Sequence, residues 1–325
     1  MKHPILLTLA CAASLGACGD DGPNKPSSTS SSGGDSGGSG SWAVGERGAM
    51  VRLTPEGEVS HYPLELGEDL RAIACKGKEQ AVVAGAAGVL LRTFDGGASW
   101  DQLDLGGAVE LRAVALSAGP TGYVVGDGVV FRSLDDSRTW DAVPSEAHDW
   151  TGVTTTAAGT TALLTSAAGE IWRLRDVTLE RVYAGDGAVL GGVAVTPDGQ
   201  QAVAVGQAGL LLRSDDAGDH WRAEPLATTR DLHAVRIAGD ASLVLAVGEA
   251  GVVVRLGADD TSIAETLDPA LALRGLHLSV SHGHAVGDDG VMLGTHDGGR
   301  TWEPVDLGLD VDLYGLDDLH GEPHL

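Results

Sequence analysis

The sequence predicts an all-β protein, a seven-bladed β-propeller whose blades each contain four strands. Three observations support this prediction. A segment of about 40 residues recurs along the chain, every copy has the same order of short apolar runs separated by glycine-rich turns, and no stretch has the 3.6-residue periodicity of an amphipathic helix. Because one such unit cannot bury its own apolar face, we expect the units to pack side by side around a common axis.

Each unit contains two strands joined by a short turn. AVVAGAAGVLLR from Ala81 and AVAVGQAGLLLR from Ala202 are two clear copies. A glycine ends the first strand of this pair, and a second glycine follows where the turn requires a positive φ. This second glycine is present in every unit, at Gly48, Gly88, Gly128, Gly169, Gly209, Gly251 and Gly290. An arginine ends the segment in six units, at Arg52, Arg92, Arg132, Arg173, Arg213 and Arg255, with Gly294 in the seventh.

Each unit also contains a strand with the pattern large apolar, variable, small, apolar, such as LRAI from Leu70 and LRAV from Leu111. The small residue in the third slot would let neighbouring blades approach closely near the axis. The chain enters the pattern at a second strand, at Trp42, and ends on a first strand, at Leu313. We therefore expect the C-terminal strand to complete the N-terminal blade, so that 42–325 forms one closed propeller.

The N-terminal residues are typical of an exported lipoprotein. Residues 1–17 have a short basic start, an apolar run and small residues before a cysteine, and LGAC at Cys18 resembles the lipobox of bacterial lipoproteins. We expect Cys18 to be lipidated, although an ordinary cleaved signal with a nearby cysteine is the alternative. Residues 18–41 are rich in Gly and Ser and predict a flexible tether. Cys75 then has no partner, and we expect it to be a buried apolar residue.

A nine-residue motif recurs within the repeat, as RTFDGGASW from Arg92 and GTHDGGRTW from Gly294. A short carboxylate can accept hydrogen bonds from the backbone of its own loop, a glycine such as Gly97 can adopt positive φ, and the tryptophan supplies apolar volume. We expect a structural role in holding a hairpin together, in preference to catalysis or calcium binding. The motif residues are Asp95 and Trp100, Asp135 and Trp140, Asp216 and Trp221, and Asp297 and Trp302.

This motif resembles the Asp-box of BNR repeats, which lies between the third and fourth strands of a propeller blade. Together with the LxAV strands, it makes the chain resemble the photosystem II stability and assembly factor-like propellers. The resemblance implies a non-enzymatic scaffold or assembly role that binds a protein, at a site near the propeller axis and away from the boxes. In the photosynthetic members a basic patch is implied for this role, whereas this chain differs from them in its charge and its lipoprotein start.

The formal charge of −25, from 21 basic and 46 acidic residues, excludes nucleic acid as a main partner because phosphate backbones would be repelled. We expect most of these carboxylates to keep an exported protein soluble. Contact with a membrane should occur only through the lipid anchor, in a periplasm-facing or cell-surface protein that is a monomer.

The variable slot of the first strands differs from this acidic background. It holds Arg71, Arg112, Thr151, Gly191, His233, Arg274 and Tyr314. Equivalent positions in a ring lie at equal distance from the axis, so we predict that Arg71, Arg112, His233, Arg274 and Tyr314 form a local basic spot that binds a carboxylate, phosphate or sulfate. His233 would add charge as the pH falls through about 6.5. The alternative is that these side chains pair with nearby acids such as Asp69, Glu110 and Asp231.

A carbohydrate-active propeller is the second function considered. Sialidases share the Asp-box and use an arginine triad and a tyrosine, but the chain has no Arg-Ile-Pro start motif and seven units where that family has six. An Asp-box polysaccharide hydrolase would need two carboxylates across a cleft. His282, His284, His320 and His324 lack companion ligands at metal spacing, so we expect no metal, no cofactor and no catalysis.

Overall fold

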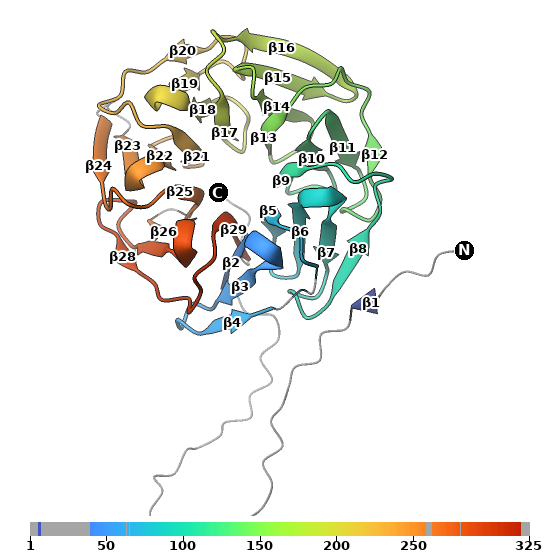
Figure 1. Cartoon of the computed structure of the whole chain (residues 1–325). Helices are drawn as coiled ribbons and strands as arrows, with labels where there is room; N and C mark the ends of the chain where they lie inside the picture. Colours follow the sequence, from blue (N-terminus) through green and yellow to red (C-terminus); the bar gives the residue numbers. More distant parts are fainter. Residues whose placement is uncertain are drawn as a thin grey trace, which may run out of the picture.

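The computed structural model describes residues 6–7, 40–62, 64, 66–257, 262–279 and 281–319. Seven antiparallel sheets stand around a central axis, each with its first strand innermost and its fourth outermost (Figure 1). This confirms the predicted seven-bladed propeller of four-stranded blades. The predicted signal segment 1–17, Cys18 and nearly all of the tether 18–41 lie outside the described residues, apart from the pair Leu6–Leu7 (β1), which is assigned to the edge of β8.

Blade 1 contains β29 (Leu313–Leu319), β2 (Gly40–Gly45), β3 (Met50–Leu53) and β4 (Val59–His61). Blade 2 contains β5 (Leu70–Lys76), β6 (Gln80–Gly85), β7 (Leu90–Thr93) and β8 (Trp100–Leu103). Blade 3 contains β9 (Leu111–Leu116), β10 (Gly122–Gly126), β11 (Val129–Ser133) and β12 (Asp141–Ala142). Blade 4 contains β13 (Trp150–Thr155), β14 (Thr161–Ser166), β15 (Glu170–Arg175) and β16 (Thr178–Ala184).

Blade 5 contains β17 (Leu190–Val195), β18 (Ala202–Gly206), β19 (Leu211–Ser214) and β20 (Arg222–Ala223). Blade 6 contains β21 (Leu232–Ile237), β22 (Leu243–Gly248), β23 (Val252–Gly257) and β24 (Ser262–Thr266). Blade 7 contains β25 (Leu273–Ser279), β26 (His282–Gly287), β27 (Met292–Thr295) and β28 (Glu303–Pro304). Five single 3₁₀ turns, η1 (Glu46–Gly48), η2 (Ala86–Gly88), η3 (Gln207–Gly209), η4 (Glu249–Gly251) and η5 (Asp288–Gly290), join second to third strands.

The C-terminal strand closes the ring as predicted. β29 pairs antiparallel with β2, in a register that places Gly40 opposite Leu319 and Val44 opposite Gly315. Strand β2 begins at Gly40, two residues before the predicted start at Trp42, because this pairing continues through Gly40 and Ser41. The first and last described residues of the propeller therefore lie together.

The turns between second and third strands explain both glycines of the repeat. The second glycine has positive φ, for example 77° at Gly88. The first glycine is extended, but a Cβ at Gly85 would lie 2.3 Å from the carbonyl oxygen of Asp69, which accepts a hydrogen bond from the N–H of Ala86. The residue between them also has positive φ without being glycine, as at Ala87, so the turn is tighter than the sequence pattern indicates.

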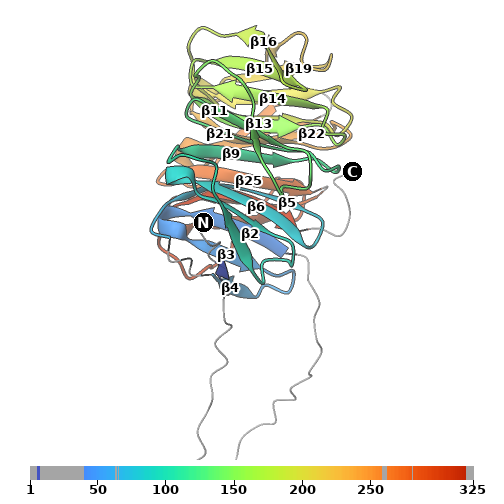
Figure 2. The same cartoon turned by 90° about the vertical axis from the view of Figure 1, so that its right-hand side faces the viewer.

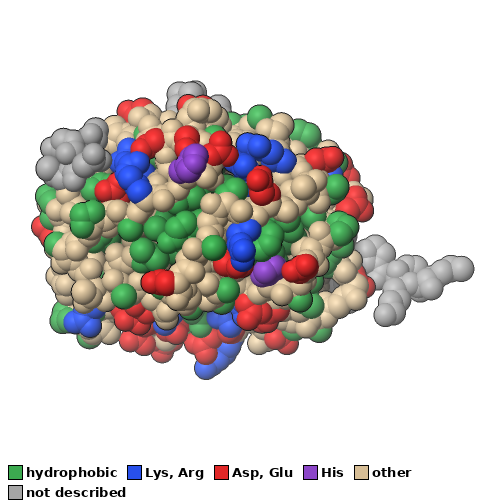
Figure 3. Space-filling view, turned by 90° about the horizontal axis from the view of Figure 1, so that it is seen from above, with side chains coloured by type: hydrophobic (Ala, Val, Ile, Leu, Met, Phe, Trp, Pro, Cys, Tyr) green, Lys and Arg blue, Asp and Glu red, His purple; other side chains and the backbone are tan. Residues whose placement is uncertain are grey.

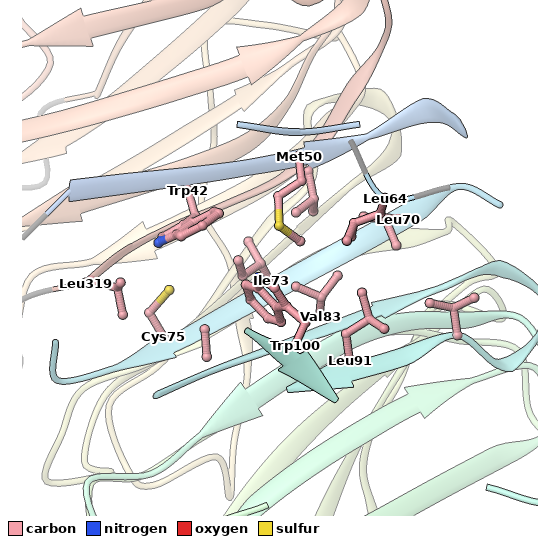
Figure 4. Packing of buried hydrophobic residues seen from close by; sticks show 13 residues of the cluster. Trp42, Met50, Leu64, Leu70, Ile73, Cys75, Val83, Leu91, Trp100 and Leu319 are labelled. Atoms are coloured by element: carbon pink, nitrogen blue, oxygen red, sulfur yellow. The ribbon is translucent and has the colours of Figure 1, made fainter. Parts of the chain in front are cut away.

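Apolar side chains of neighbouring blades form the core. Between blades 1 and 2, Trp42 and Met50 pack with Leu70, Ile73 and Trp100, all 6% exposed or less (Figure 4). The Cys75 thiol belongs to this cluster and is free, as predicted. Small third-slot residues allow the blades to meet, since a Cβ at Gly315 would lie 2.9 Å from the Cα of Ala72.

The ring is a slab with two faces (Figure 2). We call the side on which the innermost strands begin the entry face, and the opposite side, which carries the loops between third and fourth strands, the box face. Gly40 and Leu319 both lie at the box face, because β29 ends there and β2 starts there. On the outer wall near β16, acidic and basic side chains lie interspersed along both edges of the slab (Figure 3).

Candidate functional site

The variable slots of all seven innermost strands line one cavity on the axis, at the entry face. Its volume is about 150 Å³. The slots contribute Arg71, Arg112, Thr151, Gly191, His233, Arg274 and Tyr314, and the small third-slot and apolar fourth-slot residues line it more deeply. The structure thus brings the five residues of the predicted ligand-binding set together, while their role in binding stays a prediction.

The lining of this cavity is asymmetric. Blades 7, 1, 2 and 3 follow one another around the ring and contribute Arg274, Tyr314, Arg71 and Arg112. The guanidinium carbons of Arg71 and Arg274 lie 4.7 and 5.8 Å from the centroid of the Tyr314 ring, which places a cation on either side of the phenol. In the same slot, blades 4 and 5 contribute the small residues Thr151 and Gly191. One arc of the mouth therefore carries large charged and aromatic side chains, and the other arc carries small ones.

Every ring arginine has a carboxylate partner, and these acids offset the charge of the predicted basic spot at the mouth. Nε of Arg71 lies 2.8 Å from Glu110 and its Nη2 lies 3.2 Å from Asp69. Arg112 pairs with Asp127 at 2.6 Å, and Arg274 pairs with Asp288 at 2.5 Å. The alternative of internal pairing holds for Asp69 and Glu110, and the mouth is a ring of alternating charge.

Burial and charge shift the titration of several mouth residues. Burial disfavours a charged Arg71, but Glu110 and Asp69 outweigh this effect and raise its pKa. Burial, together with Arg274, lowers the pKa of His233 below 6.5, so this ring stays neutral at neutral pH. The expected gain of charge at His233 near pH 6.5 is thus moved to lower pH. Burial and Asp69 raise the pKa of Tyr314, which keeps its phenol protonated.

A second ring of residues, which the sequence analysis missed, holds the mouth in place. An acid directly before the innermost strand accepts a hydrogen bond from the N–H of the positive-φ residue in the turn of the preceding blade. Asp69 accepts from Arg47 at 2.9 Å, and Asp231 accepts from Ala208 at 2.8 Å. The signal was present, because five units carry an acid at this position: Asp69, Glu110, Asp149, Asp231 and Asp312.

A cluster of buried charge lies deeper on the axis, toward the box face. His277 is 2% exposed and lies between two carboxylates of β29, with Nδ1 2.8 Å from Asp317 and Nε2 3.4 Å from Asp318. Burial disfavours the imidazolium, but Asp318 and Asp317 outweigh burial and raise its pKa above 6.5. Arg236 from β21 acts in the opposite direction. These groups join blades 6, 7 and 1 at the place where the ring closes.

The four motif loops lie between third and fourth strands at the box face, away from the axis. In blade 2, Asp95 accepts hydrogen bonds from the N–H of Ser99 at 2.9 Å and from the Ser99 hydroxyl at 2.6 Å. The hydroxyl of Thr93 donates to Asp95 and accepts from the N–H of Gly97, which has φ of 87°. The predicted hairpin geometry of Asp95 is confirmed, whereas the part played by Thr93 was missed.

The same hydroxyl-carboxylate arrangement recurs at Asp135, Asp216 and Asp297. The motif tryptophans differ in burial. Trp100 is 2% exposed, whereas Trp140, Trp221 and Trp302 are only partly buried. The large apolar contribution predicted for all four therefore holds fully in blade 2, where Trp100 packs edge-on to Trp42 of blade 1 at a centroid distance of 5.7 Å.

The remaining histidines form packing and hydrogen-bonding contacts. His282 packs against His296 with ring centroids 5.1 Å apart, and Nδ1 of His284 lies 3.1 Å from the Ser41 hydroxyl. His320 and His324 lie outside the described residues. In the part of the chain that the structure describes, no three His, Cys, Asp or Glu side chains gather as metal ligands would, and no helix has the length and apolarity to cross a bilayer.

Comparison with known proteins finds solved structures with a similar fold. No family model and no curated protein matches the sequence. A solved structure of YCF48 from Cyanidioschyzon merolae matches with a TM-score of 0.62 and 19% identity, over 78% of this chain and 90% of that chain. A structure of YCF48 bound to a D1 peptide matches with a TM-score of 0.59 and 18% identity, over 72% and 80% of the two chains. The GH74 enzyme of Niastella koreensis matches with a TM-score of 0.56 and 13% identity, over 72% of this chain and 46% of the enzyme.

Proposed function

We propose that this chain is a non-catalytic, lipid-anchored propeller of a bacterial envelope that binds a segment of a partner protein at the axial cavity. The observation that carries the proposal is the convergence of equivalent slots from seven blades on one opening, with Tyr314 between Arg71 and Arg274. Ligand sites of propellers occupy the axis because every blade contributes a residue there.

The charge pattern favours a polypeptide segment as ligand. Each mouth arginine has an acid beside it, so a ligand that offers donors as well as acceptors can bind across these pairs. The similarity in fold to YCF48, which has been solved with a D1 peptide, supports a peptide ligand for this propeller as well.

The lipid anchor belongs to the same proposal. It rests on LGAC at Cys18, and the fold adds an orientation to it. The chain enters the propeller at Gly40 on the box face, whereas the mouth of the cavity opens on the entry face. A protein anchored through Cys18 would therefore be tethered at the face opposite its cavity.

The absence of catalysis is part of the proposal, and the composition of the cavity supports it. Glycoside hydrolysis requires two carboxylates that face the same bond. None of the described residues that line the axial cavity is Asp or Glu, and the mouth acids are engaged by arginines or by backbone N–H groups. The GH74 similarity, at 13% identity, concerns the fold alone.

Affinity capture from envelope fractions tests the proposal. The wild type, the double variant Arg71→Ala/Arg112→Ala and the box-face control Arg138→Ala would be compared, since Arg138 is 59% exposed at its side chain and far from the mouth. We expect the double variant to lose its partner, at about 1.5 to 3 kcal/mol of affinity for each arginine, while the control keeps it. Normal binding by the double variant together with a much lower melting temperature would show that these arginines serve only the fold. Turnover of any glycoside in a glycan screen would contradict the non-catalytic assignment.

A further inference from the structure

The fifth slot of the innermost strands carries a second set of charged residues on the axis. It holds Arg236, His277 and Asp317 in the consecutive blades 6, 7 and 1. The other four blades carry small residues in this slot: Ala74, Ala115, Thr154 and Ala194. The charged fifth-slot residues therefore belong to three neighbouring blades, whereas small ones such as Ala74 and Ala194 pack in the apolar clusters between blades.

Arg236 differs from the mouth arginines in its contacts. It lines the axial cavity, below the level of His233. Its Nη1 donates to the backbone carbonyl of Val235 at 3.1 Å, and no carboxylate in the described part of the chain forms an ion pair with it. Each of Arg71, Arg112 and Arg274 has such a partner. Arg236 is thus a cation of the cavity whose guanidinium still has donors to offer.

The acid whose charge acts on this guanidinium, Asp317, directs both of its oxygens to other groups. Oδ1 of Asp317 lies 2.8 Å from Nδ1 of His277, and its Oδ2 accepts a hydrogen bond of 2.7 Å from the N–H of Cys75. Asp317 acts on Arg236 through its charge, which favours the guanidinium form. A guanidinium has five N–H donors, and a cation removed from bulk water is costly unless acceptors or a counter-charge face it.

We propose that Arg236 is the anion-binding residue of the axial cavity, and that the cavity takes an oxyanion, either a carboxylate or a phosphate, whose oxygens accept hydrogen bonds from its guanidinium. Planar carboxylates and phosphates match two parallel N–H donors of arginine. A cavity of about 150 Å³ admits a molecule the size of benzene, which suits a small oxyanion or one acidic side chain. This inference rests on the proposed function, since it names the group that the partner would insert.

The mouth residues then select what reaches Arg236. Arg71, Arg112 and Arg274 are already neutralised by acids, so they provide polar walls without competing strongly for the anion. The apolar fourth-slot residues below them, such as Ile73 and Val235, exclude water around the bound group. An ion pair formed at that depth is screened less by salt than one at the mouth.

Titration with small oxyanions tests the inference without knowledge of the partner. Inorganic phosphate and N-acetylglutamate amide would be titrated into the wild type at constant pH and ionic strength, with chloride as the balancing ion. Calorimetry would give affinity and stoichiometry. We expect one site per chain for at least one of the two probes. Tighter binding of the acidic amino-acid probe identifies a partner's side chain as the natural source, and tighter binding of phosphate identifies a free oxyanion. Absence of a saturable site for both probes overturns the inference whatever the variants do.

Two substitutions with a matched control locate the site. Arg236→Gln keeps length and polarity but removes the charge, and we expect it to weaken the bound probe by about 10- to 100-fold. Arg138→Gln makes the same change on the box face, where the Arg138 side chain is 59% exposed, and its affinity should stay within about threefold of the wild type. Should Arg236→Gln fail to fold, Arg236→Lys keeps the charge and should retain binding within about tenfold. Equal losses in Arg236→Gln and Arg138→Gln would overturn the assignment to Arg236 and leave the partner-binding proposal, which envelope capture tests separately.

Discussion

The guanidinium of Arg92 in blade 2 donates a hydrogen bond of 3.0 Å to the backbone carbonyl of Ser137, in the motif loop of blade 3. The arginine of the repeat thus connects this third strand to the next blade. Arg132 reaches the carbonyl of Asp176 in blade 4, and Arg255 reaches that of Gly298 in blade 7. Arg173 likewise reaches the carbonyl of Ala217 in blade 5, so in four blades the repeated arginine is a link to the next blade.

Loss of this link should destabilise the propeller. We expect Arg92→Met to lower the free energy of unfolding by about 1.5 to 3 kcal/mol, because partly buried loop carbonyls lose a charged donor. Urea denaturation would measure the change. Arg47→Ala is the matched control, since the Arg47 side chain is 74% exposed, and its cost should stay within about 0.5 kcal/mol. Equal costs for the two variants would show that the link contributes nothing of its own.

The motif loop of blade 2 should contribute stability and not affinity. Trp100→Ala should cost about 3 to 5 kcal/mol, since its indole is 2% exposed against Trp42. Asp95→Ala should cost about 1 to 3 kcal/mol through donors of Ser99 and Thr93 left without an acceptor. Both variants should bind ligand normally where they remain folded. A folded Asp95 variant without binding would move the site from the axis to the box face.

The pair of carboxylates around His277 makes stability depend on pH. The pKa of His277 is raised in the folded state, so its contribution is fully present below the unfolded value of about 6.5 and is lost as the pH rises through the raised folded value. Asp317 and Asp318 from β29 favour the imidazolium, while Arg236 from β21 opposes it. His284 from β26 has a lowered pKa and is neutral above 6.5. We therefore expect the difference in unfolding free energy between wild type and His277→Gln to be larger at pH 6 than at pH 9. A difference that does not change with pH contradicts the charged state of His277.

The anchor can be tested at the residue that would carry it. Replacing Cys18 with Ser should abolish lipidation and release the protein from membranes, because the thiol is the acceptor of the diacylglycerol group. Membrane fractionation and the mass of the mature N-terminus would measure this outcome. Retention of the Ser variant in the membrane, with no acyl mass on the wild type, would remove the lipoprotein assignment.

The repeat made the fold predictable, because a glycine or arginine at a fixed slot marks a turn or a link whatever its neighbours are. The convergence of Arg71, Arg112 and Arg274 followed from the same symmetry. Their charge state did not, because it depends on residues outside that slot. Asp127 and Asp288 each follow the glycine that ends a second strand, in the two blades that carry Arg112 and Arg274. Blade 2 has Ala86 at that position, which offers no carboxylate, and Arg71 forms ion pairs with Asp69 and Glu110 instead.

The deeper charges show the other limit of sequence reasoning. Arg236, His277 and Asp317 share a slot, so their proximity could have been read from the repeat. The pairing of His277 with Asp318 could not be predicted in this way. Asp318 lies in the next slot, and it comes close to His277 only when the C-terminal strand closes the ring. The directions of the side chains at the junction of blades 6, 7 and 1 decide which cation pairs with a carboxylate and which one lines the cavity.

The pairing of β29 with β2 imposes an order on the assembly of the ring. The outer three strands of blade 1 are made before the other six blades, but their innermost strand is made after them. Until Leu313 to Leu319 have been made, β2 has an edge of unpaired N–H and C=O groups. Blade 1 then has three strands while the other six blades are complete. The ring therefore closes only after Leu313 to Leu319 have been made, and a chain cut short before Leu313 has an open seam at which other chains can add a strand.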